Sequence, residues 1–120
     1  MKRIKPEPFY DGLPCSIVAI GCALGRNPMG ELQELYRQAS RNDNYAALRS
    51  VNQAIRKVLD VKKYTYFPRE QRVTLKEMHI NGKAIVCVYG HYLYADSTEN
   101  TYYSFFDNEN DKVVAVWEIM

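Results

Sequence analysis

The chain has 120 residues, of which 47% are hydrophobic and 25% are charged; this size and composition predict one globular domain, 1–120. A formal net charge of +2 is too small to favour a nucleic acid or an anionic membrane as a partner. The three cysteines have no pairing pattern, so they favour a reducing compartment, and we expect a cytoplasmic protein. The longest apolar run, 17–24, is too short to cross a membrane.

The chain opens with an extended, proline-containing lead-in over residues 1–14. From Cys15 onward the apolar residues have helical spacing, and Gly25 is a typical residue to end a helix. The sequence therefore predicts a first helix over 15–24, with a cysteine where the loop becomes the helix.

Two more helices are predicted before the character of the sequence changes. Asn27 and Pro28 form a typical helix start, and the apolar stripe within 32–39 extends it. Asn44 is the candidate N-cap of a third helix, whose stripe within 48–59 is the clearest periodicity in the chain.

The second half of the chain is rich in β-forming residues. Expected strands lie at 63–67, 84–90, 91–96, 101–107 and 112–119. Turn-forming residues at 97–100 and 108–111 predict an antiparallel meander over 91–119, and Gly90 predicts a sharp bend. The predicted fold is α+β, with N-terminal helices packed on a C-terminal antiparallel sheet.

Cys15 is the first candidate for chemistry. The start of a helix presents unpaired N–H groups and a partial positive charge, and both favour a thiolate of low pKa. The competing interpretation of any single cysteine is that it packs in the core, and we expect this role for Cys22 and Cys87.

His91 and Asp107 are the next candidates. His91 begins a predicted strand directly after Gly90, whereas His79 lies in a polar connecting segment. Pairing around the 97–100 turn gives a register sum near 197, which places Asp107 opposite about position 90. By itself, Asp107 is more typical of a turn aspartate that caps its own loop. A nucleophilic cysteine needs a base and a group that orients this base, and the three residues together meet that need.

The ordered triplet Cys15, His91 and Asp107 resembles minimal papain-like cysteine hydrolases. The relatives in question are bacteriocin-processing peptidase domains and cell-wall endopeptidases of the NlpC kind, together with small phage proteins. The segments that carry the resemblance are 10–25 and 83–119, because in this fold a cysteine opens the central helix and successive strands supply a histidine and an acid.

The resemblance implies a role for each of these residues. Cys15 is the nucleophile, His91 is the general base and then acid, and Asp107 orients the imidazole, with Asn108 as its replacement. Many relatives carry a glutamine before the cysteine that donates to the oxyanion, and this chain has none there. The oxyanion hole would then depend on the backbone N–H of Cys15 and on the Tyr10 hydroxyl, which implies a slow or decayed site.

Two functions follow from these observations. The first is cleavage of a peptide, isopeptide or related amide bond, with a peptide or protein as substrate. The alternative is a catalytically weak or inactive papain-like module that binds or inhibits a partner and is encoded by a phage or a bacterium; a tyrosine-rich RNA binder is a third reading. We expect no cofactor and no metal, because the few histidines and cysteines lack ligand spacing. The sequence favours no particular oligomeric state.

Overall fold

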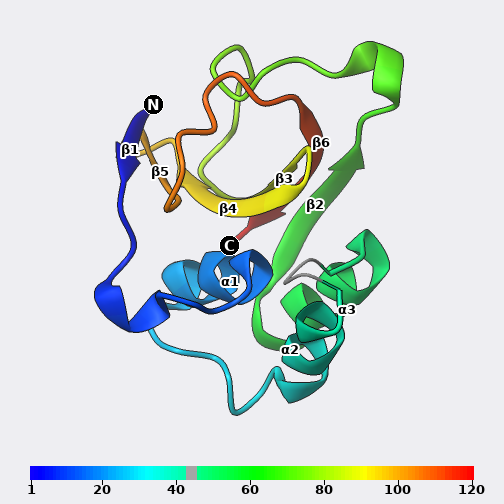
Figure 1. Ribbon diagram of the computed structural model, residues 1–120. Helices are drawn as coiled ribbons and strands as arrows, with labels where there is room; N and C mark the ends of the chain where they lie inside the picture. The colour runs from blue at the N-terminus through cyan, green and yellow to red at the C-terminus, as the bar shows by residue number, and fades with distance from the viewer. Residues whose placement is uncertain (43–45) are drawn as a thin grey trace.

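A computed structural model describes residues 1–42 and 46–120 and has the predicted α+β composition (Figure 1). The helices are α1 (Cys15–Leu24), α2 (Gln33–Ser40) and α3 (Leu48–Val58), with short 3-10 helices η1 (Pro8–Tyr10) and η2 (Arg69–Gln71). The strands are β1 (Lys2–Ile4), β2 (Val61–Tyr66), β3 (Lys83–Val88), β4 (His91–Asp96), β5 (Thr101–Tyr103) and β6 (Val113–Ile119). They form one sheet in the order β1-β5-β4-β3-β6-β2.

The prediction of helices followed by a purely antiparallel sheet is wrong in one respect. A strand, β1, precedes the helices and pairs in parallel with β5, so the sheet is mixed. This strand has three residues, Lys2–Ile4, and none is buried. It lies at the edge of the sheet, so its sequence shows no apolar alternation. Its position depends on contacts with a distant segment, such as the hydrogen bond from the Ser104 N–H to the Ile4 carbonyl. Local sequence therefore gives no sign of it.

The predicted meander over 91–119 is also wrong at its last strand. β4 and β5 are neighbours, but β6 lies between β3 and β2 and is antiparallel to both. Most of β6 is buried, which suits its sequence VVAVWEI, apolar at every position except the partly exposed Glu118. Such a strand gains more free energy in the centre of a sheet than at the edge of a meander.

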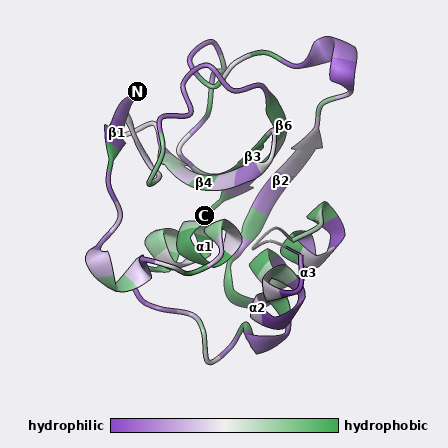
Figure 2. Ribbon diagram, in the orientation of Figure 1, coloured by the Kyte–Doolittle hydropathy of each residue, from purple (hydrophilic) through white to green (hydrophobic). Residues whose placement is uncertain are grey.

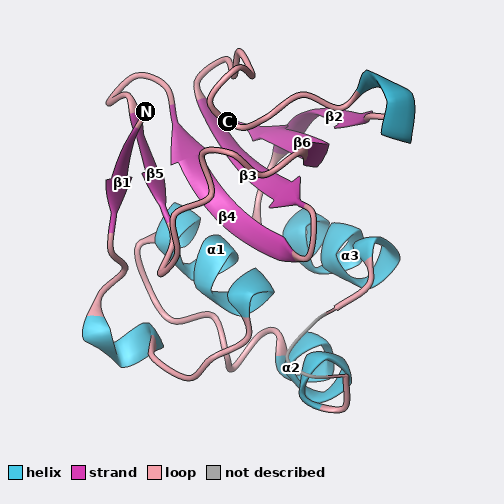
Figure 3. Ribbon diagram, turned by 45° about the horizontal axis from the view of Figure 1, so that its top comes forward, coloured by secondary structure: helices cyan, strands magenta, loops and turns pink. Residues whose placement is uncertain are grey.

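The first helix is confirmed at both ends. α1 begins at Cys15 and ends before Gly25, whose φ of 76° is the left-handed conformation that glycine adopts at helix ends. Nearly all of α1 is apolar (Figure 2), and Figure 3 shows why: the helix lies against the sheet, beside β4. It is buried on most sides rather than along one stripe.

The second helix begins later than predicted. The Asn27 side chain accepts a hydrogen bond from the Met29 N–H at 3.0 Å, so it caps a turn, and α2 starts only at Gln33. The third helix is confirmed as α3, with Val51 and Ile55 fully buried. The predicted cap at Asn44 lies outside the described residues.

The sheet has an apolar core on each face. One cluster lies between the sheet and the helices and contains Ile17, Ile20, Val51, Ile55, Ile85, Cys87, Tyr92 and Trp117. The other lies on the opposite face and contains Leu75, Ile80, Val86, Val88, Leu93, Tyr102 and Val116. Trp117 also ties α3 to the sheet, because its indole N–H donates to the Asn52 side chain at 2.9 Å.

The bend predicted at Gly90 is confirmed. β3 and β4 are joined by two residues, Tyr89 and Gly90, between the paired residues Val88 and His91. Gly90 has a φ of 76°, which a residue with a side chain adopts only at a cost. This tight turn fixes His91 at the first position of β4.

Candidate active site

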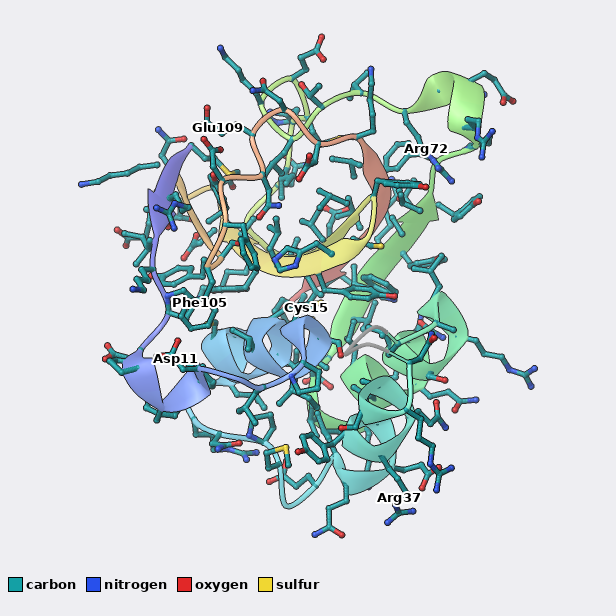
Figure 4. The ribbon with its side chains drawn as sticks, in the orientation of Figure 1. Asp11, Cys15, Arg37, Arg72, Phe105 and Glu109 are labelled. Atoms are coloured by element: carbon teal, nitrogen blue, oxygen red, sulfur yellow. The ribbon has the colours of Figure 1, made fainter. Side chains whose placement is uncertain are left out.

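A pocket of about 590 Å³ opens where the start of α1, the start of β4 and the loop after β5 meet. Its lining is mixed, with apolar side chains beside a few polar ones: Leu13, Val18, Tyr92, Tyr103, Phe105 and Phe106, and Lys5, Asp11, Cys15, His91 and Ser104. In Figure 4, Cys15 lies at the N-terminal end of α1, below β4. The pocket therefore brings Cys15 and His91, which are 76 positions apart in the sequence, to one surface hollow.

The Cys15 thiol is half-buried at the first turn of α1. Burial raises the pKa of the Cys15 thiol, although hydrogen bonds from the backbone at Tyr92, Ser16 and Cys15 itself act to lower it. The low pKa expected at a helix start is thus not found, because the loss of solvent outweighs the helix terminus. The contact with Tyr92 places the sulfur next to the residue that follows His91.

The His91 imidazole is held by the loop after β5. Its Nε2 lies 3.0 Å from the Ser104 hydroxyl oxygen, and its ring meets the Phe106 ring edge-on at 5.6 Å between centroids. Burial lowers the pKa of His91 from 6.5, and the charge of Asp111 offsets part of that effect. The net effect favours the uncharged ring, which can accept a proton.

The hydrogen bonds continue from Ser104 into the loop. The Ser104 hydroxyl donates to Asn108 Oδ1 at 2.5 Å, and Asn108 Nδ2 donates to Asp111 Oδ2 at 2.8 Å. Ser104 and Asn108 are only 2% and 4% exposed. Because buried polar side chains need partners, these links hold the loop in one conformation.

Asp107 is not beside His91. The register predicted for β4 and β5 is confirmed, since Asp96 pairs with Thr101 and Tyr94 with Tyr103. The pairing ends at Tyr103, however, so the extrapolation of that register to position 107 fails. The exposed Asp107 carboxylate instead accepts from the Tyr102 hydroxyl at 3.2 Å and from the Glu109 N–H at 3.1 Å. This is the turn-capping role that its local sequence favours.

Tyr10 also lies away from the pocket. Its ring packs against Gly21, where an added Cβ would lie 2.5 Å from Tyr10 Cε1. Its hydroxyl donates to the Arg26 carbonyl at 3.2 Å, beyond the C-terminal end of α1. Cys15 is at the other end of that helix, so the tyrosine hydroxyl cannot reach an oxyanion formed there.

The two other cysteines are unsuited to act as nucleophiles. Burial raises the pKa of Cys87 to about 12 and the pKa of Cys22 to about 11. Cys87 lies inside β3, and Cys22 lies near the far end of α1, beside Tyr10. This leaves Cys15 as the thiol that faces the pocket with the imidazole.

Ser104 and Asp111 belong to the site and were missed from the sequence. Ser104 interrupts the aromatic run of 102–106, and a lone hydroxyl in such a run was the available signal that it is buried. Asp111 lies in the predicted turn 108–111, where the local sequence favours a solvated side chain. No Cys15–His91 hydrogen bond is present among the described residues; the two groups share the pocket without one.

In comparisons with known proteins, no family model, no curated protein and no solved structure matches the chain. Within residues 1–42 and 46–120, no three His, Cys, Asp or Glu side chains are grouped so that they could hold a metal ion. Of the helices in these same ranges, none has both the length and the apolar character needed to span a membrane.

Proposed function

We propose that this chain is a cysteine hydrolase of compact papain-like type, which cleaves a peptide, isopeptide or related amide bond. One observation supports it most: Cys15 opens a helix at the wall of a pocket that His91 also lines, and His91 is fixed by the buried Ser104 hydroxyl. A nucleophile, a base and a group that orients the base are the parts such a reaction requires.

The reaction starts from a neutral pair, because burial favours both the protonated thiol and the uncharged imidazole. His91 takes the thiol proton as the sulfur attacks the carbonyl carbon, and the C–S bond forms as the carbonyl π electrons move to oxygen. The C–N bond then breaks, and the imidazolium gives its proton to the leaving amine. Water, deprotonated by His91, attacks the thioester, which releases the acid and restores the thiol.

The orienting group in this proposal is Ser104 with Asn108 behind it, in place of Asp107. The resemblance implies Asn108 as the replacement for Asp107, and Asn108 is linked to His91 through Ser104 rather than directly.

The oxyanion would be bound by the Cys15 backbone N–H, which as the first residue of α1 has no acceptor within its helix. The Tyr10 hydroxyl is remote from Cys15. The oxyanion therefore has one hydrogen-bond donor fewer than the resemblance implies. The loss of one such donor typically slows catalysis about 100- to 1,000-fold. We therefore expect a slow enzyme.

The second candidate is a papain-like module that binds a peptide or protein and does not cut it. The raised pKa of Cys15 and the lack of a hydrogen bond from its sulfur to His91 favour this candidate. Both candidates use the same pocket, so they differ only in whether the thiol is chemically competent.

Two measurements separate these candidates. A mixed peptide digest is incubated with the protein at pH 7.5 and followed by mass spectrometry; we expect new termini with wild type and Cys22→Ala, and none with Cys15→Ala. Cys22 is the matched control, since it lies on the same helix and outside the pocket. Cleavage that survives Cys15→Ala, or peptides retained uncut by the wild type, overturns the hydrolase proposal.

The second measurement is alkylation with substoichiometric iodoacetamide at pH 6. Cys22 and Cys87 are poor competitors, because burial raises their pKa values to about 11 and about 12. If His91 takes the Cys15 proton, His91→Gln should slow the labelling of Cys15 and leave the labelling of Cys22 and Cys87 unchanged. A binding module instead gives a Cys15 labelling rate that His91→Gln leaves unchanged.

A further inference from the structure

Hydrogen bonds link His91 to Ser104, Asn108 and Asp111. The donor and the acceptor of each bond can be assigned in turn, starting from Asp111. An ionised carboxylate can only accept hydrogen bonds. The atom of Asn108 that faces it at 2.8 Å is therefore the amide nitrogen, Nδ2. This contact fixes the orientation of the Asn108 amide, so its oxygen, Oδ1, must point the other way, toward Ser104.

The same logic fixes the proton of Ser104. Asn108 Oδ1 can only accept, and it lies 2.5 Å from the Ser104 oxygen. The hydroxyl has one proton, which is spent on this contact. Toward every other neighbour, Ser104 can offer lone pairs alone.

Those lone pairs meet two donors. The Phe106 backbone N–H donates to the Ser104 oxygen at 3.1 Å, and His91 Nε2 lies 3.0 Å from the same atom. Because Ser104 has no proton left for Nε2, that nitrogen must carry its own. In the uncharged ring the other nitrogen, Nδ1, is then the one with a free lone pair.

We propose that Asp111, Asn108 and Ser104 form a relay that holds neutral His91 in its Nε2–H tautomer and keeps Nδ1 as the base. Asp111 is thus a positioning residue, although it does not touch the imidazole. Ser104 and Asn108 are almost fully buried, so water does not replace a broken link. The use of Nδ1 in catalysis rests on the proposed function, whereas the tautomer does not.

The relay also explains why the loop uses Asp111 and not Asp107. Asp107 is committed to Tyr102 and to the backbone of its own turn, and neither contact leads to His91. A direct bond from a carboxylate to the imidazole would raise the pKa of His91. The relay fixes the tautomer with the charge held three hydrogen bonds away, and burial still lowers the pKa of His91.

The tautomer can be read by long-range ¹H–¹⁵N correlation of the histidine side chains at pH 7.5. The sequence has two histidines, and the exposed His79 serves as an internal reference for a ring that exchanges between tautomers. We expect His91 to show a protonated Nε2 and an unprotonated Nδ1, without the averaging that we expect for the exposed His79. A proton on Nδ1, or averaging like that of His79, overturns the proposal.

Three variants then test which residue fixes the tautomer of His91. Asp111→Asn keeps the shape but allows either amide orientation of Asn108, so the His91 signals should move toward the averaged values of His79. Ser104→Ala should have the same effect, and the matched control Asp107→Asn should leave the signals unchanged. If Asp111→Asn is also without effect, Asp111 does not fix the tautomer. The wild-type spectrum tests the tautomer even if a variant does not fold.

These outcomes are independent of the hydrolase proposal. A single Nε2–H tautomer in a protein that cleaves no peptide supports the relay and rules out the hydrolase proposal. If Asp111→Asn changes neither the cleavage nor the His91 spectrum, the hydrolase proposal is supported and the relay is ruled out.

Discussion

Two regions meet at the pocket, and they are held by different forces. α1 lies on one face of the sheet through close apolar packing, with Ile17 and Ile20 fully buried. The loop at 104–111 is held by hydrogen bonds between polar side chains, with Ser104 and Asn108 at its centre. The first region carries the thiol of Cys15, and the second holds the imidazole of His91, which β4 carries. Apolar packing positions an element along its length, whereas hydrogen bonds fix individual atoms, which is what a base requires.

The largest expected effect comes from the apolar region. Ile17→Ala removes a fully buried side chain of α1, and we expect a loss of about 2–5 kcal/mol in the free energy of unfolding, measured with denaturant. Phe106→Ala, in the loop, serves as the comparison. Phe106 is 65% exposed, so its loss should stay within about 0.5 kcal/mol. Equal losses at the two sites would mean that the loop is part of the apolar core.

A smaller effect is expected in the polar region. Asn108→Ala leaves the Ser104 hydroxyl without its acceptor and the Asp111 carboxylate without its donor. A buried group left without a partner costs about 1–3 kcal/mol, which denaturant unfolding can resolve. The control, Asp107→Ala, should lose less because water reaches that exposed carboxylate. If the control loses as much, the stability of the loop depends on its exposed turn and not on the buried links.

The smallest effects concern pH, and the two regions should respond in opposite directions. Beside the loop, burial lowers the pKa of His91 from 6.5, so the folded state disfavours the charged ring. Stability from this group is present above pH 6.5 and is lost as the pH falls through the folded pKa. We expect thermal unfolding measured below pH 6.5 to show this loss in wild type and in His79→Gln, and to show less of it in His91→Gln. A His79→Gln curve that matches His91→Gln instead would refute this assignment.

In the apolar region the loss of stability lies at alkaline pH. Burial raises the pKa of Cys22 from 9.0 to about 11, so the fold favours its protonated thiol. This stability is present below pH 9 and is lost as the pH rises toward 11. Cys22→Ala should flatten the alkaline part of the curve of stability against pH. Cys15→Ala tests separately the thiol at the pocket, whose pKa burial also raises. An unchanged alkaline slope in Cys22→Ala would show that other groups, such as Tyr94 with its pKa of about 12, dominate there.

Sequence reasoning worked where a residue's place follows from its neighbours in the chain. The bounds of α1 follow from apolar periodicity and from Gly25, and the bend before His91 follows from Gly90. The register of β4 and β5 follows from the 97–100 turn, because a turn fixes the pairing of the strands beside it. The same register could not be extended to Asp107, since nothing local shows where a strand stops pairing.

The candidate site residues show the same distinction between positions set by local sequence and positions set by distant contacts. Cys15 and His91 each stand at a boundary with a strong local signal, and both line the pocket. Tyr10 is close to Cys15 in the chain, yet its ring fits against Gly21 at the other end of α1. Asp107 and Asn108 are adjacent, and only Asn108 turns inward. Which of two neighbours in a loop is buried depends on the partners that other segments supply.

By itself, the sequence determined the α+β composition, the limits of the helix that carries Cys15 and the turn that starts the strand of His91, because propensity and periodicity act over a few residues. Tertiary structure decided the parallel β1–β5 pair, the central place of β6 and the polar links from Ser104 to Asp111. The two strand placements depend on contacts between segments far apart in the chain. The polar links are local in sequence but depend on the burial of Ser104 and Asn108, which leaves each polar group with few choices of partner.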